Sequence, residues 1–135
     1  MAGPSSALAD IGSHWCDLAQ HLTGLRIRSV LADLYTIVPQ RYRPTRSSEA
    51  FAHPQGAAEP VDIKAEDLAT VLLRFDNGVK GSLTVGQVCA GHKNDLWIEV
   101  NGRNSSVRWN QESQDDLWIG HRHEPNQILT KDPAV

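Results

Sequence analysis

The sequence predicts an α+β domain: an open, predominantly antiparallel β-sheet with a helix packed on one face. Three observations favour this class. Apolar residues recur with a helical period at the start of the chain, residues 69–85 alternate as a β-hairpin does, and the later strand-like segments follow without intervening helices. One helix followed by a run of strands is typical of such a sheet, whereas parallel sheets need alternating helices. A chain of 135 residues fits one domain, so we expect residues 1–135 to form a single domain.

Residues 5–24 predict the helix. At 3.6 residues per turn they separate into an apolar and a polar stripe. The apolar stripe, which other parts of the protein must cover, consists of Leu8, Ile11, Trp15, Leu18 and Leu22. The polar stripe consists of Asp10, His14, Asp17 and His21. Ser5 or Ser6 can cap the helix start, because a serine hydroxyl accepts a hydrogen bond from a free N–H of the first turn. Gly24 stands where a left-handed residue would end the helix.

The polar stripe has three interpretations. Polar faces of amphipathic helices usually meet water, so a solvated face is the first. The second is a metal site, but the stripe is about 16 Å long at ~1.5 Å per residue and cannot converge on one ion. The third makes His14 a proton-transfer group, with Asp10 one turn away to orient or charge it. That arrangement would support acid–base chemistry at near-neutral pH.

Residues 27–38 predict a long strand that ends at Pro39, and its mixed faces suit a strand partly covered on both sides. The next segment, residues 39–65, contains four prolines and little periodicity. A long irregular stretch is usually either a functional loop or disordered. A flexible insertion is the better interpretation, because Pro, Ser and Gly dominate and apolar anchors are few.

The clearest hairpin consists of residues 69–75 and 79–85, which flank Asp76-Asn77-Gly78. A two-residue loop would place Phe75 opposite Lys80 and mix polar with apolar side chains. A three-residue loop gives an unbroken apolar face, with Ala69 opposite Val85, Val71 opposite Leu83, Leu73 opposite Gly81 and Phe75 opposite Val79. We therefore expect a type I turn with Gly78 left-handed in a G1 bulge.

Further strands are predicted at residues 96–100, 106–110 and 117–121, the first two joined around Asn101-Gly102-Arg103. A tryptophan lies in the middle of each strand: Trp97, Trp109 and Trp118. Packing is preferred over sugar stacking as their role, since indole rings bury large areas. His92 lies in a loop that could border a cleft, and a solvated loop histidine is the alternative interpretation.

The composition, with 40% hydrophobic and 21% charged residues, is that of a soluble globular protein. A net charge of −3 gives no attraction to nucleic acid or to acidic membranes. No apolar run approaches the ~18 residues of a membrane helix and no signal-peptide layout occurs, so a cytoplasmic location is expected. Cys16 and Cys89 are far apart and predict neither a disulfide framework nor a metal site.

The first helix resembles a known motif. Ala9-Asp10-Ile11-Gly12-Ser13-His14, continued by Trp15-Cys16-Asp17 and Leu22-Thr23-Gly24, resembles the D-x-G-x-H-x-x-D helix of the glucose-fructose oxidoreductase, inositol dehydrogenase and rhizopine-catabolism (Gfo/Idh/MocA) family. The resemblance runs from about residue 3 to about residue 129, through Glu66-Asp67, Phe75-Asp76-Asn77-Gly78, Glu99-Val100-Asn101-Gly102, Trp109-Asn110-Gln111-Glu112 and Leu117-Trp118-Ile119-Gly120.

The resemblance implies an NAD- or NADP-dependent oxidoreductase that acts on the CH–OH group of a sugar, polyol or cyclitol. In the family, the histidine matching His14 is the usual general base or acid on the reacting hydroxyl. The aspartate matching Asp10 contacts the substrate and that histidine, and the one matching Asp17 has a supporting role. We add His92 as a candidate substrate-binding or supporting residue because of its loop.

The chain departs from the family by lacking the Rossmann domain, since it has neither a G-x-G-x-x-G turn nor a Glu-Lys-Pro motif. It also stops before the family's last helices. The resemblance therefore implies the substrate-binding and oligomerisation domain, similar to the C-terminal domain of glyceraldehyde-3-phosphate dehydrogenase and truncated at both ends. Such a fragment would bind no cofactor by itself and would be inactive alone.

The expected partners are a sugar or polyol substrate and further copies of the chain. An open sheet covered on one face leaves an apolar face that seeks a partner, which predicts a homodimer or a higher homo-oligomer through the sheet. The alternative function is a non-enzymatic oligomerising or scaffold domain that keeps the fold without catalysis.

Overall fold

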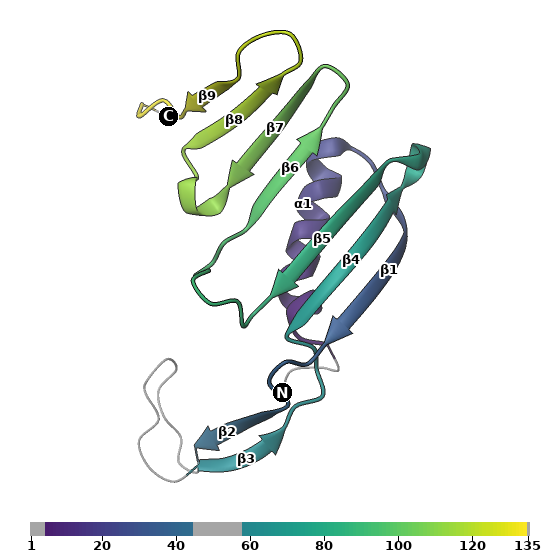
Figure 1. Ribbon diagram of the computed structural model, residues 1–135, viewed down its shortest axis with the longest axis vertical. Helices are drawn as coiled ribbons and strands as arrows, with labels where there is room; N and C mark the ends of the chain where they lie inside the picture. The colour runs from purple at the N-terminus through teal and green to yellow at the C-terminus, as the bar shows by residue number, and fades with distance from the viewer. Residues whose placement is uncertain (1–4, 45–57, 135) are drawn as a thin grey trace. The chain divides into compact units, whose positions relative to one another are not determined.

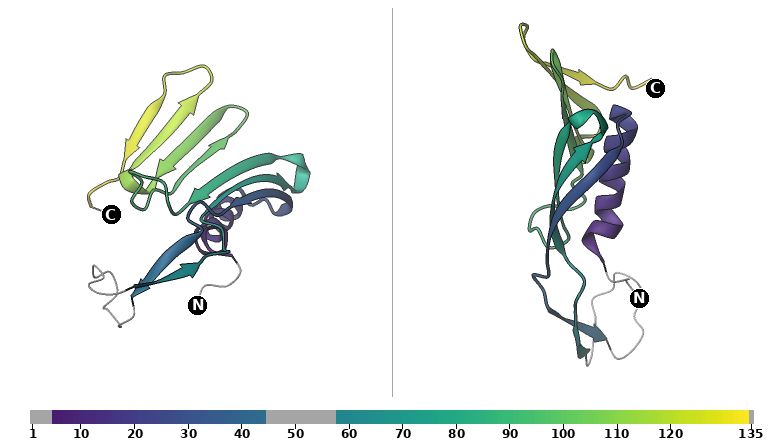
Figure 2. Two further views of the ribbon diagram at one scale, coloured as in Figure 1. Left: turned by 60° about the horizontal axis from the view of Figure 1, so that its bottom comes forward. Right: turned by 90° about the vertical axis from the view of Figure 1, so that its right-hand side faces the viewer.

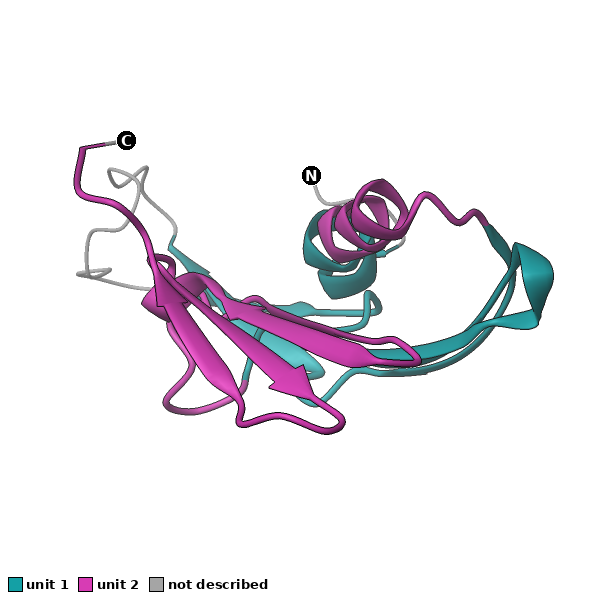
Figure 3. Ribbon diagram, turned by 90° about the horizontal axis from the view of Figure 1, so that it is seen from above, with its two compact units in different colours: residues 1–13, 27–88 teal, residues 14–26, 89–135 magenta. Residues whose placement is uncertain are grey.

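The computed structural model describes residues 5–44 and 58–134. The chain divides into two compact units, one formed by residues 1–13 and 27–88 and the other by residues 14–26 and 89–135 (Figure 3). The sequence predicts one domain over this length, and the two units are described in turn. All paired strands are antiparallel and α1 (Ser13–Thr23) is the α-helix of the described residues, which confirms the predicted α+β class.

The first unit contains a three-stranded antiparallel sheet in the order β1-β4-β5, with β1 at Ile27–Tyr35, β4 at Leu68–Phe75 and β5 at Lys80–Gly86 (Figure 1). Every second residue of β4 is buried, as the alternation of side chains across a strand requires. The buried apolar residues of this unit are Ala7, Ala69, Val71, Leu73, Phe75, Leu83 and Val85. The helical segment η1 (Leu8–Gly12) packs against β5 and so covers one face of the sheet.

The register predicted for the β4–β5 hairpin is confirmed. Ala69 pairs with Val85, Val71 with Leu83 and Leu73 with Gly81. Gly78 is left-handed, with φ of 83°, as expected. The predicted type I turn is wrong, because Asn77 has φ of 67° and a type I turn needs negative φ at both central residues. Asp76–Gly78, labelled η2, forms a tight turn in which Asn77 and Gly78 are both left-handed.

Residues 39–65 are more regular than predicted. Gln40–Pro44 and Ala58–Asp62 form β2 and β3, which pair antiparallel as a separate two-stranded ladder (Figure 2). The prediction of an irregular loop is therefore wrong for these two segments. Residues 45–57 lie outside the described residues.

Strand β1 is shorter and more exposed than predicted. It ends at Tyr35 instead of continuing to residue 38, and all its residues after Ile27 are exposed. The expectation that both faces are partly covered is wrong within the described chain, because side chains on both faces of β1 are exposed.

The second unit contains a four-stranded antiparallel sheet in the order β6-β7-β8-β9 and all of α1 after Ser13. The strands are β6 (Trp97–Asn101), β7 (Ser105–Asn110), β8 (Asp116–His121) and β9 (Gln127–Thr130), with the 3₁₀ segment η3 (Gln111–Ser113) between β7 and β8. The first three strands confirm the predicted ones to within a residue at each end. Strand β9 was not predicted.

The tryptophans of the second unit differ in burial. Trp109 and Trp118 are half-buried, as the packing interpretation requires, whereas Trp97 is 55% exposed. The indole N–H of Trp15 donates to the backbone carbonyl of Trp97 at 3.0 Å, which ties α1 to β6. None of the helices described has the length and apolar character needed to cross a bilayer.

Candidate functional site

Three of the predicted site residues, Asp10, His14 and Asp17, lie on one uninterrupted helical stretch that begins in the π-conformation. Residues Leu8–Gly12 form the π-helical segment η1, and α1 follows directly. The amide of Ser13 donates to the carbonyl of Leu8, five residues back, which is the bond that defines a π-turn. Such turns are rare and occur frequently at functional sites. Asp10 lies inside the π-helical segment, and His14 is the second residue of α1.

The π-segment changes which side chains are buried. Ala7, Gly12 and Ala19 are buried, whereas Ile11 and Leu22 of the predicted apolar stripe are exposed. The predicted stripe is therefore wrong at both positions. At Ile11, inside the π-segment, the reason is that a π-turn holds more residues than the α-turn on which the prediction was based. A Cβ atom at Gly12 would lie 2.7 Å from Cδ1 of Leu8 but at an ordinary contact distance from Val85, so the glycine leaves room for the Leu8 side chain.

All four residues of the polar stripe are exposed: Asp10, His14, Asp17 and His21. Within the described residues, none of these side chains makes a hydrogen bond or an ion pair. They are therefore open to solvent and are not engaged in internal structure. The exposure agrees with the first interpretation, a solvated face, and leaves the side chains free for a substrate.

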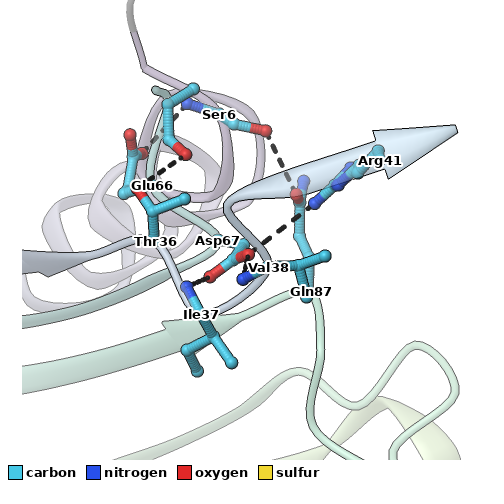
Figure 4. A network of polar contacts seen from close by, with 9 residues as sticks. Ser6, Thr36, Ile37, Val38, Arg41, Glu66, Asp67 and Gln87 are labelled. Carbon is cyan, nitrogen blue, oxygen red and sulfur yellow. Dashed lines mark hydrogen bonds and ion pairs between the residues drawn. The ribbon is translucent and has the colours of Figure 1, made fainter. Parts of the chain in front are cut away.

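The helix start is capped by Glu66 and not by a serine. One carboxylate oxygen of Glu66, Oε1, accepts a hydrogen bond from the Ser6 amide at 3.0 Å (Figure 4). The same oxygen accepts from Ser5 Oγ at 2.7 Å and from the Leu8 amide at 2.9 Å. The predicted cap by Ser5 or Ser6 is wrong: the Ser5 hydroxyl donates to Glu66, and the Ser6 hydroxyl bonds to Gln87. Burial raises the pKa of the Glu66 carboxyl, but these hydrogen bonds outweigh burial and lower the pKa overall.

Asp67, next in the chain, is fully buried and ends strand β1. Its two carboxylate oxygens accept the amides of Ile37 at 2.7 Å and Val38 at 2.9 Å (Figure 4). Those amides are consequently unavailable to a β-ladder, which explains why β1 ends before the predicted residue. Burial raises the pKa of Asp67, but the two amides and the Arg41 guanidinium, 3.8 Å away, lower it overall.

His92 lies in the connection between β5 and β6 and has a carboxylate partner that the sequence prediction missed. Its Nδ1 atom is 2.7 Å from Oδ2 of Asp95, and the other oxygen of Asp95 accepts Asn110 Nδ2 at 3.0 Å. The His92 side chain is 63% exposed, whereas that of Asp95 is 12% exposed. The only sequence signal for this pair is the three-residue spacing. No hydrogen bond or ion pair joins His92 to His14 or Asp17 among the described residues.

The residues described do not fit a metal ion or a dinucleotide. No group of three or more His, Cys, Asp or Glu side chains in residues 5–44 and 58–134 could hold a metal. Dinucleotides bind at a glycine-rich turn between a parallel strand and a helix. The strands in these ranges pair only antiparallel, so they build no such unit.

Comparisons with known proteins relate this fold and helix to a family. The family model for the GFO/IDH/MocA C-terminal domain matches residues 2–108. Levoglucosan dehydrogenase of Pseudarthrobacter phenanthrenivorans is 30% identical over 116 residues, which are 85% of this chain and 30% of that protein. The chain thus spans less than a third of the length of this relative.

Solved structures give the same relationship. An oxidoreductase domain protein from Kribbella flavida matches with a TM-score of 0.77 and 31% identity over 93% of this chain and 32% of that one. An inositol dehydrogenase homolog from Azotobacter vinelandii, complexed with NADH and myo-inositol, matches with a TM-score of 0.72 and 26% identity over 95% of this chain and 28% of that one. The chain belongs to the GFO/IDH/MocA family, in which it corresponds to the C-terminal domain.

Proposed function

We propose that this chain is the substrate-binding and oligomerisation part of an NAD(P)-dependent oxidoreductase that acts on the CH–OH group of a sugar, polyol or cyclitol. The observation that carries the proposal is the exposed polar stripe, in which Asp10 and His14 stand four residues apart with no internal partner. With no internal partner these two side chains are available to a substrate, and the π-turn at the helix start is a feature that occurs frequently at functional sites.

The related proteins support the substrate class. One relative is a levoglucosan dehydrogenase, and another was solved with NADH and myo-inositol. Both ligand names denote polyhydroxylated rings with secondary alcohols. The redox chemistry would belong to a nicotinamide cofactor bound outside this chain, since the described residues do not fit one.

The residues of this chain handle the proton and the substrate. His14 accepts the proton of the reacting hydroxyl when the alcohol is oxidised and returns it when the carbonyl is reduced. Asp10 positions the substrate and the imidazole, and Asp17, one turn beyond His14, supports the site. His92, oriented by Asp95, is a candidate for binding a substrate hydroxyl.

This chain alone should not turn over substrate. Orientation of the reacting groups supplies up to ~7 to 11 kcal/mol of such a barrier, and the cofactor surface is not among the residues described. The second candidate function is a non-enzymatic oligomerising or scaffold domain.

The experiment that tests the proposal measures hydride transfer by nicotinamide absorbance in the full-length protein against a panel of polyols and aldoses. His14→Ala should lower kcat by roughly 10²- to 10⁴-fold with a modest change in KM. His21→Ala is the matched control, since His21 is an exposed histidine of the same stripe. It should leave kcat within about twofold of the wild type. Equal kcat values for the two variants would contradict the role of His14, and an inactive wild type would favour the scaffold function.

A further inference from the structure

We propose that Glu66 is the positioning residue of the helix that carries Asp10 and His14, an inference that rests on the proposed function. Glu66 lies two residues before the start of β4 and is only 5% exposed. It touches neither proposed catalytic side chain, so it would act through the first turn of the helix.

Three successive amides of the helix start donate to Glu66. The Ser6 and Leu8 amides bond to its Oε1 atom, and the Ala7 amide bonds to its backbone carbonyl at 3.2 Å. These amides belong to the group of N–H donors that a helix leaves without partners at its start. A single residue of the segment before β4 therefore fixes the position of the whole first turn.

Hydrogen bonds continue from these amides to the proposed site. The Asp10 amide donates to the carbonyl of Ser6 at 2.9 Å, so the residue that bears the carboxylate is bonded to a residue fixed by Glu66. The amide of Ser13, the residue before His14, bonds to the carbonyl of Leu8, which Glu66 also fixes. Each proposed catalytic residue is thus at most one residue away from a bond leading back to Glu66.

The negative charge of Glu66 contributes as well as its geometry. An anion at a helix N-terminus is stabilised by the aligned peptide dipoles. The same carboxylate also fixes Ser5, so its loss would release residues 5–8 together. The π-segment that contains Asp10 begins at Leu8, where the last of these bonds is made.

Two variants of the full-length protein remove the contact to different degrees. Glu66→Ala removes all three side-chain bonds, and Glu66→Asp keeps the charge but is one methylene too short to reach the same amides. Glu66→Gln keeps an acceptor oxygen at the same distance and serves as the conservative rescue. Asp67→Ala is the matched control, because Asp67 is an equally buried neighbour that bonds to Ile37 and Val38 and not to the helix.

Two readouts separate positioning from general stability. In Glu66→Ala, amide hydrogen exchange at residues 6–10 should be roughly tenfold faster than in the wild type. Its kcat should fall roughly 10- to 100-fold, because misplacement by about 1 Å costs that much. Glu66→Asp should show both effects in smaller measure, which keeps the test available if the alanine variant does not fold. Glu66→Gln should restore most of kcat.

Asp67→Ala should lower Tm while leaving kcat and the exchange of residues 6–10 near wild-type values. A Glu66→Ala protein with lowered Tm and unchanged kcat would overturn the inference, since a purely structural residue gives that pattern. Unchanged exchange at residues 6–10 would overturn it independently of activity. A wild-type protein without turnover would instead refute the proposed function, and the exchange rates would still show whether Glu66 fixes the helix.

Discussion

Gly120 in β8 is a position where a single methyl group should destabilise the second unit. A Cβ atom there would overlap the ring of Trp118, two residues earlier on the same face, and the ring is rigid. The ring also has a cation–π contact with Arg108, whose guanidinium carbon lies 5.1 Å from the ring centroid. We expect Gly120→Ala to lower the free energy of unfolding by about 1 to 3 kcal/mol, measured by urea denaturation.

Gly24→Asn is the control for that measurement. Gly24 is left-handed with φ of 69°, and nothing lies within 4 Å of its Cβ position. Asparagine tolerates this conformation, so the control should change stability by only a few tenths of a kcal/mol, roughly. Equal losses in the two variants would show that the Trp118 ring moves aside without cost.

Single residues were predictable from the sequence where their partners are local. Gly24 ends the helix left-handed as expected, because the signal lies within the helix itself. The helix cap was not predictable in the same way, since Glu66 is 58 residues away from the Leu8 amide. Asp10, His14 and Asp17 are exposed on the helix, as their place on the predicted polar stripe indicates, and their roles are proposals.

Three elements, η1, β1 and β4, meet at the neighbouring carboxylates of Glu66 and Asp67. The free energy of unfolding of the first unit should therefore depend on pH. Glu66 bonds to the start of the helix and Asp67 to the amides that follow β1. Both pKa values are lowered in the folded state, so the unfolded state binds more protons as the pH falls. The stabilisation is therefore fully present above about pH 5 and is lost as the pH falls from there through the folded pKa values.

The measurement is the free energy of unfolding in urea between pH 7 and pH 3. We expect the double variant Glu66→Gln with Asp67→Asn to be less stable than the wild type at pH 7 and to lose less stability on acidification. Glu59→Gln is the control, because Glu59 is exposed and lies 3.8 Å from Arg43 in an exposed pair. It should keep the wild-type slope, and a double variant that also kept this slope would contradict the role of the two carboxylates.

Elements were predictable where side-chain alternation was strong. The β4–β5 register followed from the single alignment that gives an unbroken apolar face. The turn type was missed although its signal is local, because asparagine is one of the few residues besides glycine that adopt the left-handed conformation, as Asn77 does. β2 and β3 contain prolines, and their mostly exposed residues do not alternate between apolar and polar. The sequence therefore has no periodic pattern from which these two strands could be predicted. The same holds for β9, whose four residues are all exposed.

At the scale of the whole molecule, the family assignment was predictable from the sequence and the division into two units was not. The motif of the first helix and the order of later segments pointed to the family that the comparisons show. The division depends on contacts among residues far apart in the chain, including the separation of residues 14–26 from residues 1–13. No local pattern in the helix marks that boundary.

The open face of the β1–β4–β5 sheet predicts how the full-length protein assembles. Leu31 and Leu72 are direct cross-strand partners on this face, 70% and 55% exposed, and Tyr35 lies on the same face at 63%. Exposed apolar groups on a sheet face favour a second copy of the same surface, and a two-fold dimer would bring the two faces together. We expect Leu72→Lys to shift full-length protein toward smaller species in sedimentation velocity, because it would place charges in that interface.

Leu129→Lys, at a 51% exposed leucine on β9, is the control and should sediment as the wild type. Unchanged assembly in Leu72→Lys would show that the subunits associate through another surface.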